Sequence, residues 1–137
     1  MSTTKALVTA VLAVGLGVSQ TAGAAATVAP VAQVYAHVNS NGAVISQHGV
    51  SAVTHPATGV YCVLPVSATL QNAVASGVVA PVVSLDYSNT PDELVTVVFG
   101  GTNTNYCPSQ NYMVVLSYYL APGVFQAKDA AFVLLYV

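Results

Sequence analysis

Residues 49–63 constrain the fold most, because they hold two short β-prone runs around a turn signal. Val, Thr and Tyr dominate both runs, and the His-Pro-Ala-Thr-Gly sequence between them is typical of a β-hairpin with a longer loop. Pro56 fixes its own φ at about −65° and favours extended geometry at His55. Gly59 can supply a positive φ before the second strand. The stretch therefore predicts an antiparallel strand pair that carries Cys62 on its second strand.

Short β-prone runs alternate with turn residues along the rest of the chain. Asn41-Gly42 separates the first two runs, and Asn-Gly is a strong hairpin signal because type I′ turns need positive φ at both central residues. The expected strands cover residues 34–38, 43–47, 50–54, 59–64, 82–87, 94–99, 112–120 and 130–137. We predict an all-β fold, an antiparallel and jelly-roll-like β-sandwich of about eight or nine short strands.

Two segments allow a helical interpretation. Ala, Leu and Gln in residues 67–76 could form a helical turn, but Gly77 and the Val-Val-Ala-Pro that follows favour a strand, limited by Pro81 to an edge or a strand start. Residues 90–93, Thr-Pro-Asp-Glu, have the form of a capping box. The β-branched run after them is too short for a helix, so we expect a turn there.

The N-terminus has the pattern of a secretory signal peptide. Met1–Lys5 carries one positive charge, residues 6–18 are apolar, and residues 19–24 end in small side chains. A retained membrane anchor is the alternative, but glycines and polar residues interrupt the run before the roughly 20 apolar residues that a span needs. The predicted organisation is a signal peptide over residues 1–24, an extended leader over 25–33 and a single β-sandwich domain over 34–137.

Charged residues make up only 4% of the chain and hydrophobic residues 55%, against a typical charged share of about 25%. This balance excludes intrinsic disorder. The two basic residues, Lys5 and Lys128, are too few to neutralise a phosphate backbone, so no nucleic acid is expected as a partner. Net repulsion between copies is weak, which favours self-association and leaves a homo-oligomer open.

Cys62 and Cys107 are the two cysteines of the chain. An even pair in a secreted protein is expected to form a disulfide, and two free buried thiols are the alternative. Neither cysteine has a partner at Cys-x-x-Cys spacing, which argues against a metal or redox site. Closing a loop of this size stabilises the fold by roughly 4 kcal/mol on entropic grounds.

Several expected strands are apolar on both faces, notably those over residues 59–64 and 130–137. An antiparallel strand of this kind must be covered twice. The second cover is either the loop tied down by the disulfide or another subunit. Because Cys62 lies on the side that needs covering, we expect the loop over residues 100–112 to lie across it.

Residues for catalysis or metal binding are scarce, and we predict no catalytic residues, no metal site and no cofactor. The sequence lacks Gly-x-Ser-x-Gly, His-Glu-x-x-His and a phosphate-binding glycine loop. A Ser-His-Asp triad assembled from distant positions stays open, so a small secreted hydrolase is an alternative. The histidines match no ligand motif and are expected in turns or at the surface, and a Ca²⁺ site at the carboxylates near Pro91 is less favoured than a solvated turn. The histidines are His37, His48 and His55. The carboxylates considered for Ca²⁺ are Asp86, Asp92 and Glu93, and the fourth carboxylate of the chain is Asp129.

The polar loop over residues 100–112 is the best candidate for a binding site. Amides and hydroxyls beside aromatic rings suit sugar or peptide surfaces, and a loop anchored by a disulfide loses less entropy on binding. An ordinary polar loop is the alternative, because Asn, Thr and Gly also simply form loops. The candidate ligand-binding residues are Asn103, Asn105, Tyr106, Gln110 and Tyr112.

Residues 34–83 carry a family resemblance in Val34-Tyr35-Ala36-His37-Val38, Asn41-Gly42, and the runs over 49–54 and 58–63. This pattern of a strand, a glycine turn, Val-x-x-Val-Thr, a Thr-Gly corner and x-Tyr-x-Val resembles the β-module of phage tail fibres and related surface proteins. It is also similar to small secreted proteins of unknown function from high-GC Gram-positive bacteria. The resemblance implies binding or structural work and supplies no catalytic residues. In the fibre module the positions flanking the Tyr and Val are usually polar, whereas here they are Val60, Cys62 and Leu64.

We therefore predict a secreted, non-catalytic binding or structural module of the cell surface or extracellular space. Its expected partner is a glycan or a protein surface, with no membrane contact after signal cleavage. A self-assembling extracellular subunit is a further alternative.

Overall fold

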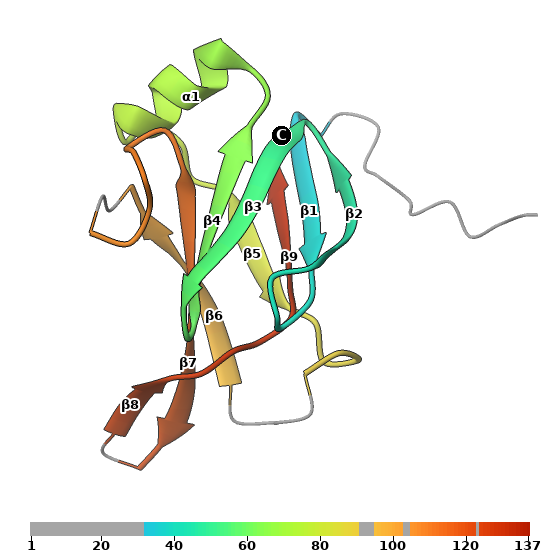
Figure 1. Ribbon diagram of the computed structural model, residues 1–137, viewed down its shortest axis with the longest axis vertical. Coiled ribbons are helices and arrows are strands. Elements are labelled where there is room, and N and C mark those ends of the chain that lie inside the picture. The colour runs from blue at the N-terminus through green and yellow to red at the C-terminus, as the bar shows by residue number, and fades with distance from the viewer. Residues whose placement is uncertain (1–31, 91–94, 103–104, 123) are drawn as a thin grey trace, which may run out of the picture.

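The computed structural model describes residues 32–90, 95–102, 105–122 and 124–137, and it shows two antiparallel β-sheets packed face to face (Figure 1). Sheet A has the order β2 (Val44–His48), β1 (Val34–Val38), β9 (Phe132–Tyr136), β5 (Val82–Leu85). Sheet B has the order β3 (Val50–Ala57), β4 (Val60–Pro65), β7 (Met113–Ala121), β6 (Val95–Gly101), and β8 (Val124–Ala127) pairs with β7. The described residues thus form nine strands, and the predicted all-β sandwich is confirmed.

The main core lies between the two sheets and is made by alternate residues of each strand. At its centre the Tyr61 ring meets the edge of the Phe132 ring, with 5.0 Å between the ring centroids. Both side chains are fully buried. The strands around them contribute Val34, Ala36, Val38, Val63, Met113, Val115 and Leu134.

The hairpin between β1 and β2 is confirmed, but its turn is not type I′. A type I′ turn needs positive φ at both central residues, and among the described residues only glycines have positive φ. Gly42 alone supplies it here, at φ +83°, and its N–H donates to the Asn39 carbonyl at 2.9 Å. A Cβ added to Gly42 would lie 2.6 Å from the Cβ of His55, so this turn packs tightly on β3.

The hairpin between β3 and β4 is also confirmed, but the longer loop expected from His55 to Gly59 is wrong. Strand β3 continues through Pro56 to Ala57, and only Thr58 and Gly59 make the turn. The register shifts between Thr54 and Ala57, an irregularity that accommodates a proline within a strand. Gly59 has φ +70°, as predicted.

The strand favoured for residues 67–76 is wrong, because Ala68–Ala75 forms helix α1. The Ser67 side chain accepts a hydrogen bond from the Leu70 N–H at 3.3 Å and caps the N-terminus. Leu70 and Val74, four residues apart, face the core. Gly77, which had favoured a strand, ends the helix at φ +70° while the next N–H returns to the Ala73 carbonyl, as in a Schellman motif.

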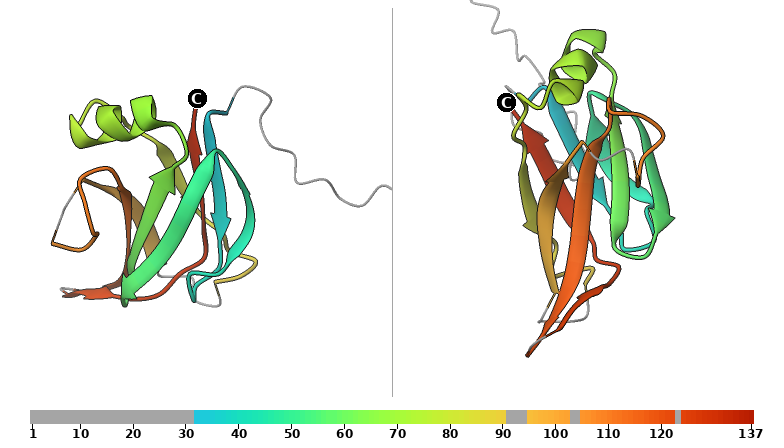
Figure 2. Two further views of the ribbon diagram at one scale, coloured as in Figure 1. Left: turned by 45° about the horizontal axis from the view of Figure 1, so that its top comes forward. Right: turned by 90° about the vertical axis from the view of Figure 1, so that its left-hand side faces the viewer.

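The last strands differ from the prediction in one respect. After β7 the chain turns at Pro122 and returns as β8, which was not expected. The β7–β8 hairpin extends beyond the rest of the sandwich, at the end opposite α1 (Figure 2).

The predicted signal peptide, most of the leader and the turn at residues 91–93 lie outside the described residues. Within the described ranges, no helix is long and apolar enough to cross a membrane.

Candidate functional site

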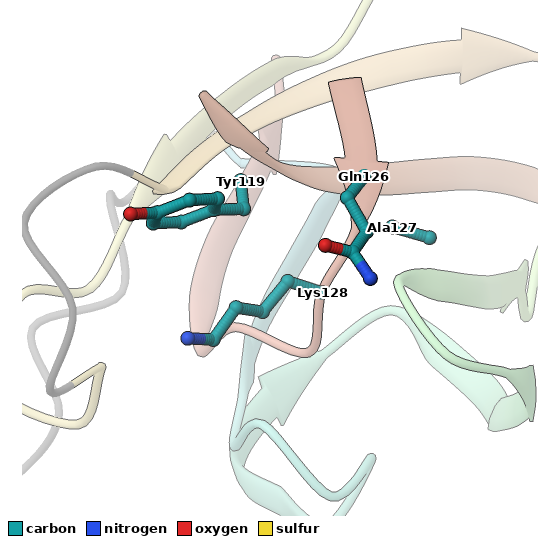
Figure 3. A pocket seen from close by; sticks show the side chains of 4 residues that line it. All are labelled: Tyr119, Gln126, Ala127 and Lys128. Atoms are coloured by element: carbon teal, nitrogen blue, oxygen red, sulfur yellow. The ribbon is translucent and has the colours of Figure 1, made fainter. Parts of the chain in front are cut away.

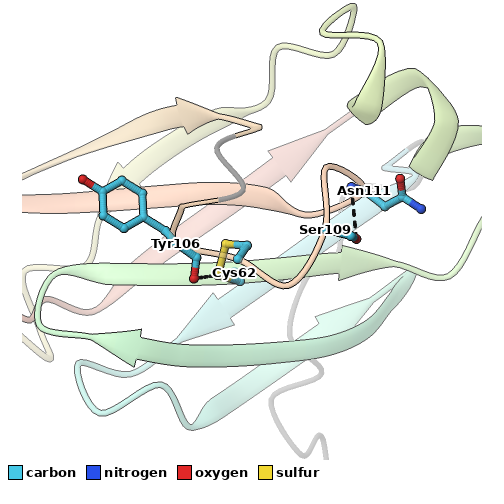
Figure 4. Close-up of a disulfide and its surroundings, with 5 residues drawn as sticks. Cys62, Tyr106, Ser109 and Asn111 are labelled. Atoms are coloured by element: carbon cyan, nitrogen blue, oxygen red, sulfur yellow. Dashed lines mark hydrogen bonds between the residues drawn. A yellow bond between two sulfur atoms is a disulfide. The ribbon is translucent and has the colours of Figure 1, made fainter.

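The predicted disulfide between Cys62 and Cys107 is present, with 5.8 Å between the two Cα atoms. It ties the loop before β7 to the middle of β4, and both cysteines are buried (Figure 4). The Cys62 Sγ lies 3.8 Å from the carbonyl oxygen of Tyr106. This is a packing contact and no hydrogen bond, because a disulfide sulfur carries no proton.

The disulfide-tied loop, residues 105–112, covers the outer face of sheet B at this point. Beneath it is a second apolar cluster, separate from the main core, in which Cys107 is packed with residues of β4 and β7. The cluster comprises Val60, Cys62, Cys107 and Val114, with Tyr112 and Leu116 packed against it. Since the inner face of β4 joins the main core, the loop is the second cover that the doubly apolar pattern required.

The disulfide-tied loop exposes part of the predicted binding set. Asn105 and Gln110 are exposed, and Tyr106 is 44% exposed with its ring directed away from the disulfide (Figure 4). Tyr112 is half-buried against the cluster below, so its ring contributes to the support of the loop. Asn103 lies outside the described residues.

The surface of this loop is polar and uncharged. Residues 105–112 contain amides, hydroxyls, two tyrosines and a proline, but no ionisable carboxylate, amine or imidazole. Within the loop the Asn111 N–H donates to the Ser109 hydroxyl at 3.4 Å (Figure 4). The arrangement can offer hydrogen bonds and one aromatic face to a neutral ligand.

His37 and Asp86 form the first of two histidine–aspartate pairs, neither of which the sequence had indicated. The His37 Nε2 lies 2.7 Å from the Asp86 carboxylate. The same carboxylate accepts from the Asn89 amide at 2.6 Å and the Ser88 N–H at 2.9 Å. The hydrogen bond from Asn89, followed by that from His37, lowers the pKa of Asp86 below its usual value.

His55 and Asp129 form the second pair, with 2.9 Å between Nε2 and the carboxylate. Asp129 also accepts from the Gly59 N–H at 2.6 Å. The His55 ring stacks on Tyr61 at 4.5 Å between centroids. The pair thus joins the β3–β4 turn to the segment that precedes β9.

The hydroxyl of Tyr61 completes this network. It donates to the Ser40 carbonyl at 2.7 Å and accepts from the Ala130 N–H at 3.0 Å. Burial raises the pKa of Tyr61 to about 12, and the negative charge of Asp129 adds to the rise. These two hydrogen bonds join the turn before β2 to the segment before β9, so the network closes this end of the sandwich.

The expectation of surface or turn histidines is wrong for two of the three. His48 is exposed at the end of β2, whereas His37 and His55 are held by aspartates 49 and 74 residues away in the chain. Within the described ranges neither paired ring bonds to a serine or cysteine side chain, and no three His, Cys, Asp or Glu side chains gather as metal ligands. Each pair links two segments that are distant in the chain, and we call the two pairs clamps for that reason.

A shallow cleft of about 370 Å³ lies at the β7–β8 hairpin, lined by Tyr119, Gln126, Ala127 and Lys128 (Figure 3). Tyr119 and Gln126 are opposite each other in the hairpin register. The Lys128 ammonium lies 5.3 Å from the centroid of the Tyr119 ring. No pattern in the sequence predicts this cleft, because β8 itself is not predicted.

Comparison with known protein families, with curated proteins and with solved structures finds no match for this chain.

Proposed function

We propose that this chain is a secreted, non-catalytic binding module of the extracellular space or cell surface, and that the disulfide-tied loop contacts its ligand. The observation that carries the proposal is the anchoring of that loop: Cys107 fixes it to a central strand while Tyr106 stays 44% exposed. A loop already fixed on a rigid sheet loses little conformational entropy when a ligand binds.

The chemistry of the loop favours a neutral glycan as the ligand. Sugars present hydroxyls for amide and hydroxyl partners and C–H faces for aromatic rings. The disulfide-tied loop offers these groups through Asn105, Tyr106 and Gln110 and carries no charge. The cleft at Lys128 suits an acidic ligand instead, although its ammonium already lies over the Tyr119 ring.

Secretion is supported by two features. A buried disulfide such as Cys62–Cys107 persists in an oxidising compartment, and residues 1–24 have the pattern of a cleavable signal. The resemblance of residues 34–83 to the β-module of phage tail fibres and related surface proteins also favours an extracellular location, and it stays a prediction.

The non-catalytic part of the proposal is supported by how the described carboxylates are used. Asp86 and Asp129 each accept hydrogen bonds from a histidine and from a backbone N–H. Both carboxylates are therefore used to hold turns and to link strands. No specific observation favours the secreted hydrolase.

An immobilised panel of neutral and acidic oligosaccharides tests the proposal. The parent should bind neutral members, and Tyr106→Ala should weaken that binding about tenfold or more, because an exposed aromatic anchor is lost. Tyr87→Ala is the matched control, since Tyr87 is 69% exposed and lies in a turn outside the loop. This control should bind like the parent.

Three other results decide against parts of the proposal. If no member of the panel is bound, the glycan class is wrong. Equal weakening by the two tyrosine variants would show that the loop is not the contact. Binding confined to acidic members and lost in Gln126→Ala would assign the ligand to the cleft instead.

A further inference from the structure

Most open strand edges of the sandwich carry a feature that hinders pairing with another chain. Such features include prolines, bulges, charges and covering elements. Strand β2 has a register shift where Val44 pairs with Val38, and β3 has Pro56 and two register shifts. Strands β5 and β6 lie side by side where the two sheets meet, so each covers the edge of the other (Figures 1 and 2).

Of the features that hinder edge pairing, strand β8 has only its short length of four residues. It pairs with β7 in a register without shifts, and its sequence, Val-Phe-Gln-Ala, has neither a proline nor a charged residue. All four of its side chains are exposed. Among the described residues it pairs with no strand other than β7, so its second edge is open.

The hairpin also presents an apolar face beside this edge. Leu120 lies opposite Phe125 in the β7–β8 register, so the two side chains share one face. Leu120 is 41% exposed and Phe125 is 79% exposed. Tyr119 and Gln126 form the next pair and lie on the other face, with the cleft.

We propose that β8 of one copy pairs antiparallel with β8 of a second copy about a two-fold axis, joining sheet B of both copies. Phe125 then lies opposite its own counterpart, which places two Leu120–Phe125 pairs in one continuous apolar row. A second copy fits this edge because antiparallel pairing of identical strands is self-complementary.

Charge also favours a second copy as the occupant. The hairpin from Met113 to Ala127 has no charged residue, and the whole chain has a formal net charge of −2, so repulsion between two copies is weak. The paired strands are only four residues long. The contact therefore falls below the usual size of a stable interface, and association should be weak and concentration-dependent.

Sedimentation of the purified secreted protein over a range of concentrations tests the pairing. The parent should shift from monomer towards dimer as its concentration rises into the millimolar range. Phe125→Glu and Phe125→Lys should each remain monomeric, because like charges then lie directly opposite across the axis. An equimolar mixture of these two variants should recover the dimer, because Glu then lies opposite Lys. Leu120→Glu is the matched control, because Leu120 lies on the same face but in β7, whose backbone does not form the proposed contact. This variant should still associate.

Every other outcome overturns the proposal in a defined way. A parent that stays monomeric throughout, or a Phe125→Glu variant that still dimerises, shows that β8 is not the interface. Loss of association in both Phe125→Glu and Leu120→Glu, with no recovery in the mixture, assigns the contact to the apolar face and removes the edge pairing. Circular dichroism of each variant checks that it keeps the strand content of the parent.

Discussion

The two halves of β7 differ in their surroundings. In the first half Met113, Val114 and Val115 are fully buried, so both faces of the strand are covered. In the second half Tyr118 is half-buried and Leu120 is 41% exposed, and the strand continues into the projecting hairpin. One strand thus passes from a sealed region into an open one.

The difference lies in what covers the outer face. Over the first half the disulfide-tied loop is held by Cys107 and packs on Val114 and Leu116. Over the second half the chain supplies β8 as a neighbour within the sheet, but no described segment packs on its outer face as the loop does on the cluster. The strand is therefore closed within the chain where a covalent link fixes a cover, and it is more exposed where the described residues supply no such cover.

Removing the covalent link should have the largest effect on this contrast. The Cys62→Ser, Cys107→Ser double variant should lose about 4 kcal/mol of unfolding free energy, because the unfolded chain regains the entropy of a 45-residue loop. It should also bind a hydrophobic dye that the parent does not bind, since the cluster under the loop becomes exposed. Denaturant unfolding and dye fluorescence measure the two effects. A variant that is dye-silent and nearly as stable as the parent would show that the loop is not the cover.

Tyr61→Phe tests the hydrogen bonds that join the turn before β2 to the segment between β8 and β9. The variant leaves the Ser40 carbonyl and the Ala130 N–H without their hydroxyl partner, which should cost about 1–3 kcal/mol. The fold favours the neutral phenol, whose pKa is about 12 against an ordinary value near 10. Its contribution is therefore complete below pH 10 and is lost as pH rises from about 10 through 12. Unfolding measured across this range should show an alkaline loss that is smaller in Tyr61→Phe; identical pH profiles would contradict the assigned role.

Leu116→Ala and Leu120→Ala compare the two halves of β7 directly, and they should have the smallest effects on the unfolding free energy. The residues are four apart on the same face of β7, but Leu116 packs on the cluster under the loop and over Gly100, while Leu120 is largely open. We expect Leu116→Ala to lower the unfolding free energy by about 1–2 kcal/mol, less than a fully buried leucine. Leu120→Ala should change it by about 0.5 kcal/mol at most. Equal losses in denaturant unfolding would remove the distinction between the halves.

Features encoded within a few residues could be predicted from the sequence. The hairpin from β3 to β4 follows from two β-branched runs around Gly59, and the disulfide follows from an even cysteine pair in a chain with a signal-like N-terminus. The need for a second cover on β4 follows from its apolar residues on both faces. These are local or pairwise facts, and the structure confirms them.

Features that depend on distant or competing contacts could not be predicted. Gly77 is compatible with a strand boundary and with the end of a helix, and only the burial of Leu70 and Val74 on the core decides for α1. The His55–Asp129 clamp joins residues 74 positions apart with no local motif. Strand β8 is four residues long, too short for its own pattern to separate it from a turn.

Native-state amide hydrogen exchange along β7 and β8, at a concentration where the chain is monomeric, tests the central contrast most directly. If the disulfide-tied loop seals only the first half, the amides of Val114 and Val115 should exchange only through global unfolding. Those of Leu120 and Phe125 should exchange faster, through local opening of the hairpin. Equal protection along the whole of β7 and β8 would contradict the account, because both halves would then belong to one equally closed unit.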